Sequence, residues 1–136
     1  MSKTRHTDRT YRLIESWGWS DWWPVEIFNM FSGKKTDFFH IIDCLVLTRK
    51  GVVGIQICGA DYSEHVRKIM DYEQVNTRKW LSTPNTRLLL IGWRKLKRGK
   101  RRLFFPRIAK ITMEKGILVY YEHPLNKEKI WTAGRY

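Results

Sequence analysis

Cysteine, acidic side chains and long apolar runs are scarce in this sequence. Only Cys44 and Cys58 are present, and neither lies in a spacing typical of a zinc site. We therefore expect a reducing compartment and two buried, unpaired thiols. No apolar run approaches the roughly 20 residues that a membrane-spanning helix needs. Residues 1–10 are polar, without the apolar stretch of a secretory signal. These absences favour a cytoplasmic protein with no membrane partner.

Basic side chains are abundant. The chain carries 26 Lys and Arg against 13 Asp and Glu, which gives a net charge of +13 and a pI of about 10.0. Such a surplus points to a polyanionic partner, because Lys and Arg neutralise phosphate groups. The alternative is a surplus that only keeps the protein in solution.

The 136 residues suit a single domain over 1–136. Apolar periodicity predicts helices and strands in the order helix 10–17, strands 23–31, 38–47 and 52–58, helix 61–76, and strand 87–93. Asp61 and Glu64 form a capping-box pattern at the second helix. The strand–helix–strand crossover from 52 to 93 predicts parallel pairing. We expect an α/β fold with a mixed sheet flanked by helices.

The segment after the predicted core, about 94–136, has a different character. It opens with a basic hairpin and continues with strand-like stretches at 104–105, 117–121 and 130–131. We interpret it as a β-rich C-terminal extension of a core that spans about 10–93.

Asp43 is the acidic residue that most needs an explanation. It lies in an apolar segment, where a carboxylate has to be paired, bound to a metal ion, or exposed at the end of a strand. Strand alternation places Asp43 on the face opposite Cys44, where it could meet Gln56 and Cys58 of the next strand. Its alternative interpretation is a turn or ion-pair residue.

The order of elements around Asp43 resembles the PD-(D/E)xK nuclease superfamily, which includes the Holliday-junction resolvases, over roughly residues 10–93. In that family an Asp and a Glu-x-Lys on the neighbouring strand form the site. Asp43 and the run Gln56, Ile57, Cys58 occupy these places, and the Mrr-like branch of the family is similar in carrying Gln-x-Lys. The resemblance implies a restriction-endonuclease-like fold.

The resemblance also implies a metal-dependent nuclease that uses Mg²⁺ or Mn²⁺. Asp43 and Gln56 are then catalytic and metal-ligating, since amide and carboxylate oxygens suit hard cations. Cys58 departs from the family pattern, because a neutral thiol cannot supply the charge of the Lys. Lys68 in the following helix is the first candidate to replace it, and Lys35 the second.

Further carboxylates are candidates for the same metal ion. Glu26 is the favoured third ligand, with Asp37 at the start of the Asp strand as another and Asp8 or Glu15 as weaker options. Each of these also has a plain reading as a surface or capping residue. Of the histidines, which lack metal-ligand spacing, His40 and His65 could approach Asp43.

The basic run is the predicted phosphate-binding element. Its members follow the last core strand and are Arg94, Lys95, Lys97, Arg98, Lys100, Arg101 and Arg102. Clusters of this kind bind nucleic acid without sequence preference. The alternative is a solvated hairpin that protects a sheet edge. A tryptophan cluster offers a stacking surface or core packing, namely Trp17, Trp19, Trp22 and Trp23.

Three functions remain open at the level of sequence. The first is a DNA endonuclease, acting on branched or structured DNA and able to form a homodimer as resolvases do. The second is an inactive nuclease fold that binds DNA or RNA, which the loss of Lys at Cys58 favours. The third is a basic factor, typical of phage or mobile elements, that binds an acidic protein.

Overall fold

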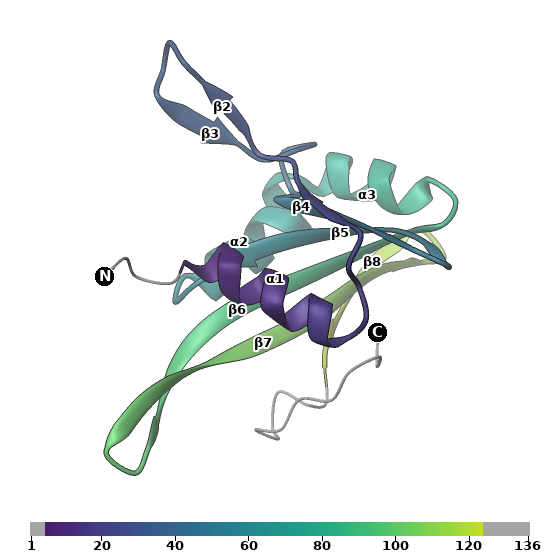
Figure 1. Ribbon diagram of the computed structural model, residues 1–136. Helices are drawn as coiled ribbons and strands as arrows, with labels where there is room; N and C mark the ends of the chain where they lie inside the picture. The colour runs from purple at the N-terminus through teal and green to yellow at the C-terminus, as the bar shows by residue number, and fades with distance from the viewer. Residues whose placement is uncertain (1–4, 124–136) are drawn as a thin grey trace.

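The computed structural model describes residues 5–123. A six-stranded sheet with the order β1-β4-β5-β6-β7-β8 forms its centre (Figure 1). All neighbouring strands are antiparallel except β5 and β6, which are parallel. The strands are β1 (Trp22–Pro24), β4 (Cys44–Thr48), β5 (Gly51–Cys58), β6 (Thr86–Arg98), β7 (Arg101–Glu114) and β8 (Ile117–Glu122).

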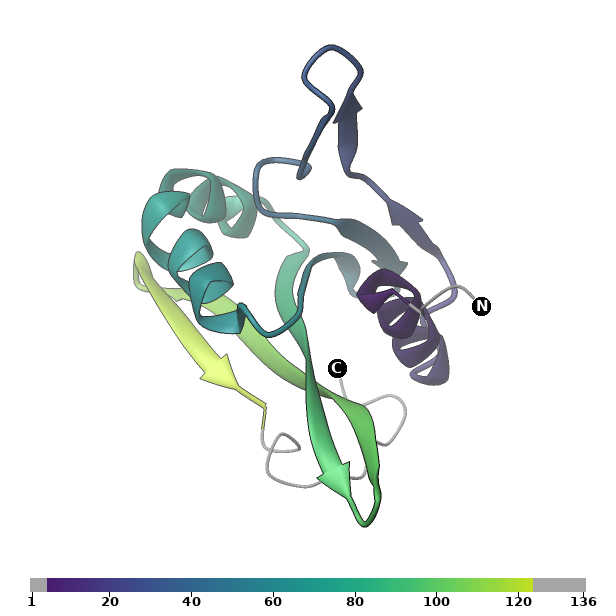
Figure 2. The same ribbon diagram turned by 90° about the vertical axis from the view of Figure 1, so that its left-hand side faces the viewer.

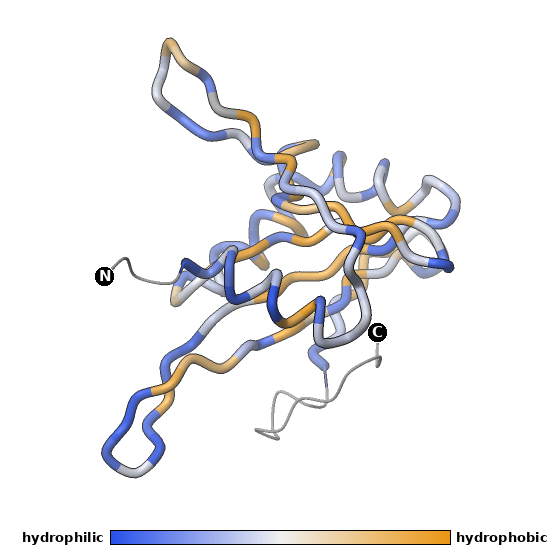
Figure 3. The backbone as a smooth tube through the Cα atoms, in the orientation of Figure 1, coloured by the Kyte–Doolittle hydropathy of each residue, from blue (hydrophilic) through white to orange (hydrophobic). Residues whose placement is uncertain are grey.

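Helices cover both faces of this sheet (Figure 2). One face carries α1 (His6–Ser16), and the other carries α2 (Tyr62–Arg67), the π-helical turn η1 (Lys68–Tyr72) and α3 (Gln74–Ser82). Each interface holds its own cluster of buried apolar side chains, and the tube in Figure 3 is most hydrophobic along the central strands. The predicted α/β class, the mixed sheet and its helical flanks are confirmed.

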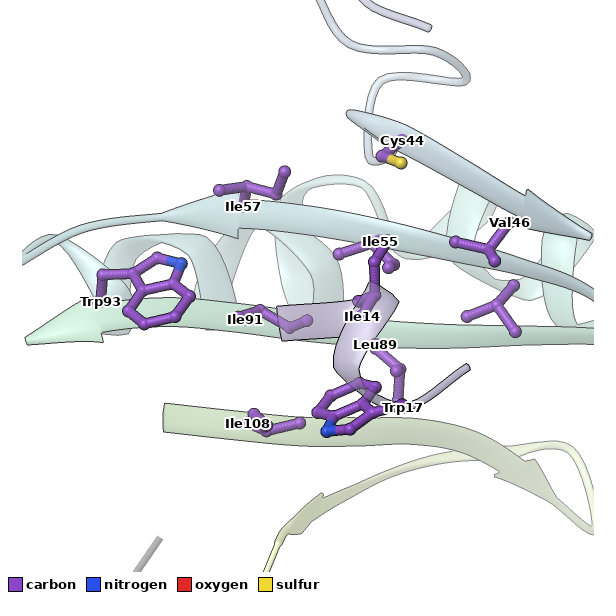
Figure 4. Packing of buried hydrophobic residues seen from close by; sticks show 11 residues of the cluster. Ile14, Trp17, Cys44, Val46, Ile55, Ile57, Leu89, Ile91, Trp93 and Ile108 are labelled. Atoms are coloured by element: carbon purple, nitrogen blue, oxygen red, sulfur yellow. The ribbon is translucent and has the colours of Figure 1, made fainter. Parts of the chain in front are cut away.

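The first cluster fixes α1 on the sheet. Ile14 and Trp17 are buried and lie over Leu89, Ile91 and neighbouring side chains of the sheet (Figure 4). The two positions are three residues apart, so they share one side of a helix. The indole of Trp93 also donates to the Thr10 hydroxyl at 2.9 Å, which gives both buried polar groups a partner.

The second cluster fixes the crossover helix. Gly92 lets Tyr62 of α2 lie against β6, because a Cβ at this position would be 2.4 Å from the Tyr62 ring and 3.1 Å from the Cys58 sulfur. Ile108, Ala109 and Ile111 of β7 contribute to the same two clusters. The sheet therefore continues past the predicted core of 10–93 into the C-terminal segment.

Two hairpins project from the body in opposite directions in both ribbon views (Figures 1 and 2). The β6–β7 hairpin continues beyond Gly92, which pairs with Cys58 at the end of β5, and turns at Gly99. The other is the two-stranded sheet of β2 (Ile27–Asn29) and β3 (Lys34–Thr36). The predicted basic hairpin is confirmed as a structural element.

Several predicted boundaries are wrong. The single strand 23–31 is divided between β1 and β2, and the strand 38–47 is reduced to β4, with a turn over 38–43. The helix expected from 61 to about 76 or beyond does reach Ser82 but is interrupted by η1, while the strand 87–93 continues to Arg98. Asp61 is the N-cap residue of α2 but makes no capping hydrogen bond. Its carboxylate instead accepts from Gly59 and contacts His65.

Other sequence predictions concern the cysteines and the membrane. Cys44 and Cys58 are both free and buried, as predicted. Among the described residues, no helix is long and apolar enough to cross a membrane. The predicted strand at 130–131 lies outside the described residues.

Candidate metal centre

Asp43 lies immediately before β4, where the backbone holds it tightly. Its N–H donates to Ile55 at 2.8 Å, and its carbonyl accepts from Val25 at 3.0 Å. The side chain is 5% exposed. One carboxylate oxygen, Oδ2, accepts the backbone N–H of Ile57 at 2.7 Å. These backbone contacts direct the side chain of Asp43 toward β5.

Gln56 joins this carboxylate to a second one. Its Nε2 donates to Asp43 Oδ2 at 2.9 Å and to Asp37 Oδ2 at 2.8 Å. The Gln56 side chain is fully buried, and its Oε1 has no hydrogen-bond partner among residues 5–123. A buried amide oxygen without a partner is unusual, because its desolvation is not compensated.

Lys68, in the crossover helix between β5 and β6, contacts the Asp37 carboxylate. Its Nζ lies 2.6 Å from Asp37 Oδ2. Lys68 is the first residue of η1, and single π-helical turns occur frequently at functional sites. The crossover helix thus places an ammonium group beside Asp37.

Glu26 completes a group of three carboxylates. Ligand atoms of Glu26, Asp37 and Asp43 all lie within 4.8 Å of one another. Glu26 precedes β2 and Asp37 follows β3, so the two ends of one hairpin bring these residues together. Lys35 is 3.8 Å from Glu26, where both side chains are partly exposed. The three carboxylates therefore run from the interior to the surface.

The two aspartates have opposite pKa shifts. Burial raises the pKa of Asp43 to about 8, and the hydrogen bond and negative charge of Asp37 add to this. Burial also disfavours ionised Asp37, but hydrogen bonds from Asp43, Lys68 and Gln56 outweigh it and lower the Asp37 pKa. At neutral pH one proton thus lies between the two carboxyl groups, on Asp43.

These residues fit a divalent cation. Two carboxylates that share a proton in a partly buried site repel each other once both are ionised, and a cation would relieve that repulsion. Oxygen donors from carboxylates and amides suit Mg²⁺ and Mn²⁺. Rotation of the Gln56 amide would also turn its unpartnered Oε1 toward Asp37 and Asp43. The acidic group can therefore hold a metal ion.

A cleft of about 490 Å³ opens beside Asp43. Its wall combines two of the carboxylates, Asp43 and Glu26, with cationic and polar side chains from the start of the chain, α1 and β3, namely Arg5, His6, Tyr11 and Lys35. Such a wall gives the carboxylates a path to solvent. Arg5 and His6 were not predicted as site residues, because no spacing in the sequence links α1 to β5.

The other candidates lie elsewhere or serve other contacts. Asp8 pairs with Arg5, and Glu15 accepts from the Trp22 indole. His65 is paired with Asp61. Cys58 borders the cleft, where burial raises its thiol pKa to about 12 and keeps it neutral.

The basic run lies on both strands of the β6–β7 hairpin. Lys95 and Lys97 are exposed on β6, and residues 100–102 are exposed around the tip. Lys95, Lys97, Lys100, Arg101 and Arg102 form no ion pair with a residue of the described segment. This hairpin extends from the end of the sheet at which β5 ends and the cleft opens. Figure 3 shows its tip as strongly hydrophilic.

The predicted tryptophan cluster is divided between uses. Trp17 packs in the core, edge-on to Trp19, and Trp22 stacks on Tyr11 with ring centroids 3.9 Å apart. Trp23 is 73% exposed. The four side chains therefore form no continuous stacking surface.

No family model, curated protein or solved structure matches this chain. Its function is therefore inferred below from its own residues.

Proposed function

We propose that the protein is a metal-dependent deoxyribonuclease with a restriction-endonuclease-like fold of the PD-(D/E)xK type. The observation that carries the proposal is the contact of Lys68 with Asp37, at 2.6 Å, beside the Gln56 amide that joins Asp37 to Asp43. The nuclease resemblance requires an Asp, a Glu or, as in the Mrr-like branch, a Gln on the next strand, and a nearby Lys ammonium. Here the ammonium comes from a different element.

The order of elements supports the same fold. The proposed metal ligands lie at the start of β4, within β5 and at the base of the β2–β3 hairpin. The parallel pair of β5 and β6, joined through α2, η1 and α3, provides the crossover that carries Lys68. The central sheet thus holds Asp43 and Gln56, the β2–β3 hairpin holds Glu26 and Asp37, and the Lys68 ammonium comes from a helix packed against the sheet.

Asp43, Asp37 and Glu26 would hold Mg²⁺ or Mn²⁺, with Gln56 as a further oxygen donor. A cation of this kind supplies Lewis-acid chemistry for phosphodiester hydrolysis, because it lowers the pKa of water and offsets the charge of the phosphate. Lys68 keeps Asp37 ionised and adds positive charge close to the phosphate. Asp43, whose pKa is raised to about 8, would have to release its proton to ligate such a cation.

The basic β6–β7 hairpin supports DNA as the substrate. Its exposed Lys and Arg side chains would bind backbone phosphates beyond the cleft, which gives affinity without base recognition. A homodimer, with two clefts on one branched DNA, is compatible with this arrangement.

One observation favours a second candidate, an inactive nuclease fold that binds nucleic acid. The neutral thiol of Cys58 occupies the place of the family Lys, and Lys68 then serves only to neutralise Asp37. The two candidates share the same hairpin and differ in hydrolysis.

The test uses the full chain with supercoiled plasmid, single-stranded DNA and a four-way junction, each with Mg²⁺ or Mn²⁺. We expect cleavage that falls by about 100-fold or more in Asp43→Ala and Lys68→Met, in line with the loss of one electrostatic group in an active site. Lys79→Met, an exposed lysine of α3, is the matched control and should cleave normally. Salt-sensitive binding without cleavage by the wild-type protein would establish the second candidate instead.

A further inference from the structure

The β2–β3 hairpin, called the arm from here on, comprises residues 26–37. Its strands pair only with each other in the described structure, and Figures 1 and 2 show it standing clear of the body. An isolated two-stranded hairpin is only marginally stable in water. We therefore expect this projecting hairpin to have a function of its own.

The tip of the arm is an ordered turn that displays apolar side chains. The Asn29 carboxamide oxygen accepts the N–H groups of Phe31 at 2.9 Å and Ser32 at 3.2 Å. Gly33, with a φ of +69°, closes the turn by donating to the Asn29 carbonyl. Met30 is 85% exposed and Phe31 is fully exposed. The local hydrogen bonds thus present two large apolar groups to solvent.

Charge on the arm is arranged along its length. Lys34 is exposed next to the tip, whereas the Lys35 ammonium lies 3.8 Å from Glu26, which with Asp37 forms the acidic base of the arm. An apolar tip with an adjacent cation matches a nucleic acid, which combines stacked bases with a phosphate backbone. This charge complementarity is less suited to a second copy of a chain that carries +13.

The base of the arm is the metal centre itself. Glu26 and Asp37 supply two of the three carboxylates, and Asp37 also contacts Lys68. At about 3.3 Å per residue, the tip lies roughly 15 Å from Asp37, which is about four or five base steps along DNA at 3.4 Å each. DNA that is bound at the metal centre and runs along the arm would pass within reach of Phe31.

We propose that the tip of the arm is a wedge: Phe31, supported by Met30, inserts between stacked bases of DNA a few steps from the phosphate at the metal centre. Apolar side chains inserted in this way unstack a base step and kink the duplex. Such a wedge would also give the protein a cleavage preference, and that part of the proposal rests on the proposed nuclease function. The site then takes DNA whose bases are unpaired or easily opened near the wedge, such as forks and junctions.

The wedge is tested first by binding alone, without metal ions. A series of duplexes carries 2-aminopurine at successive positions, because its fluorescence rises when the base is unstacked. Wild-type protein should raise the signal at one or two adjacent positions, and Phe31→Ala should reduce the rise to less than about half. Phe31→Trp should retain it. Val75→Ala, a comparably exposed apolar residue of α3, is the control and should leave it unchanged.

Cleavage provides the second measurement. With Mn²⁺, Phe31→Ala should cleave a fully paired duplex about tenfold more slowly, which corresponds to about 1.4 kcal/mol. It should cleave a duplex with a mismatch at the 2-aminopurine position at the wild-type rate. If the wild-type protein cleaves nothing, the nuclease proposal fails, while the fluorescence still decides whether the wedge exists.

Two results would overturn the wedge. One is an equal fluorescence rise with wild-type protein and Phe31→Ala, which would mean that any unstacking has another source. The other is a dimer of the wild-type protein in sedimentation that Phe31→Ala converts to a monomer, with no fluorescence change in either. In that case the tip contacts a second copy of the chain.

Discussion

Asp43 and Asp37 are chemically identical groups that their surroundings make different. Asp43 is the more buried and receives no cation directly, whereas Asp37 contacts Lys68. The negative charge of each raises the cost of ionising the other, so the pair keeps one proton. This difference should make both the stability of the protein and its affinity for metal ions depend on pH.

Asp43→Asn should stabilise the metal-free protein at neutral pH. The folded-state pKa of Asp43 is raised to about 8, while an unfolded Asp ionises near pH 4. Between these values the folded state binds more protons than the unfolded state, so wild-type stability falls as the pH rises. Asp37 is ionised in both states across this window. Chemical denaturation at pH 5 and pH 8 should show a fall in the wild-type protein that is smaller, by about 1 kcal/mol or more, in the variant.

Metal binding should depend on pH through the same proton. Because Asp43 must ionise before it can ligate a cation, the apparent Mn²⁺ affinity should increase by up to about tenfold per pH unit below pH 8 and level off above it. Calorimetry in buffers of different ionisation enthalpy should detect release of about one proton. Binding that does not change between pH 6 and 8 would place the metal ion away from Asp43.

Gln56→Glu separates the metal centre from a purely structural network. A fourth carboxylate, fully buried beside the two aspartates, should lower the free energy of unfolding by about 2–4 kcal/mol without metal. Added Mn²⁺ should recover most of this loss, because a cation neutralises the extra charge. Gln74→Glu, on the exposed start of α3, is the control. Melting temperatures that do not respond to Mn²⁺ in either variant would contradict a metal centre.

At the residue scale the sequence predicts much of this site. Asp43, Gln56, Glu26 and Lys68 come together as candidates because strand parity and a crossover helix restrict where their side chains can lie. The contact of Lys68 with Asp37, and the pairing of Asp37 with Gln56, depend on the turn over 38–43. Nothing in the spacing of residues encodes that turn's geometry.

At the scale of elements, the same turn is the largest difference from expectation. Residues 38–43 are apolar and resemble a buried strand, yet Phe39 and His40 have φ values of 56° and 62°. Non-glycine residues rarely adopt such values, and a hydrophobic pattern does not record them. Ile41 and Ile42 are nevertheless buried. The apolar pattern therefore predicted their burial correctly but not their secondary structure.

The crossover helix was also predicted only in part. Its apolar positions predict a helix, but the change from α2 to η1 depends on packing against the sheet. Gly92 is the point of closest approach. Gly92→Ala should lower the free energy of unfolding by about 1–3 kcal/mol, because its Cβ would overlap Tyr62. Denaturant unfolding measures this loss. As a control, Tyr62→Leu is added to Gly92→Ala, because the smaller side chain removes the overlap and should recover stability. If it does not, the loss arises in the β6 backbone and not from contact with Tyr62.

At the scale of the whole molecule, the position of the basic hairpin is the main feature. Three carboxylates gather at the candidate metal centre, and the exposed cations of the β6–β7 hairpin extend beyond the end of the sheet at which the cleft opens. The total charge and the basic run could be read from the sequence, because neither depends on how the chain folds. Their placement relative to the cleft could not, because it follows from β6 continuing past the end of β5.

This placement predicts which cations bind DNA. Replacing Lys100, Arg101 and Arg102 by alanine should weaken binding and reduce the slope of log K against log salt by about two to three, since each phosphate contact contributes about 0.9. The control replaces Arg49, Lys50 and Lys79, three exposed cations away from the hairpin. It removes the same charge, so the two triple variants separate a local contact from a general field. Equal slopes in fluorescence-anisotropy titrations at several salt concentrations would mean that DNA responds to net charge and that the hairpin holds no phosphate.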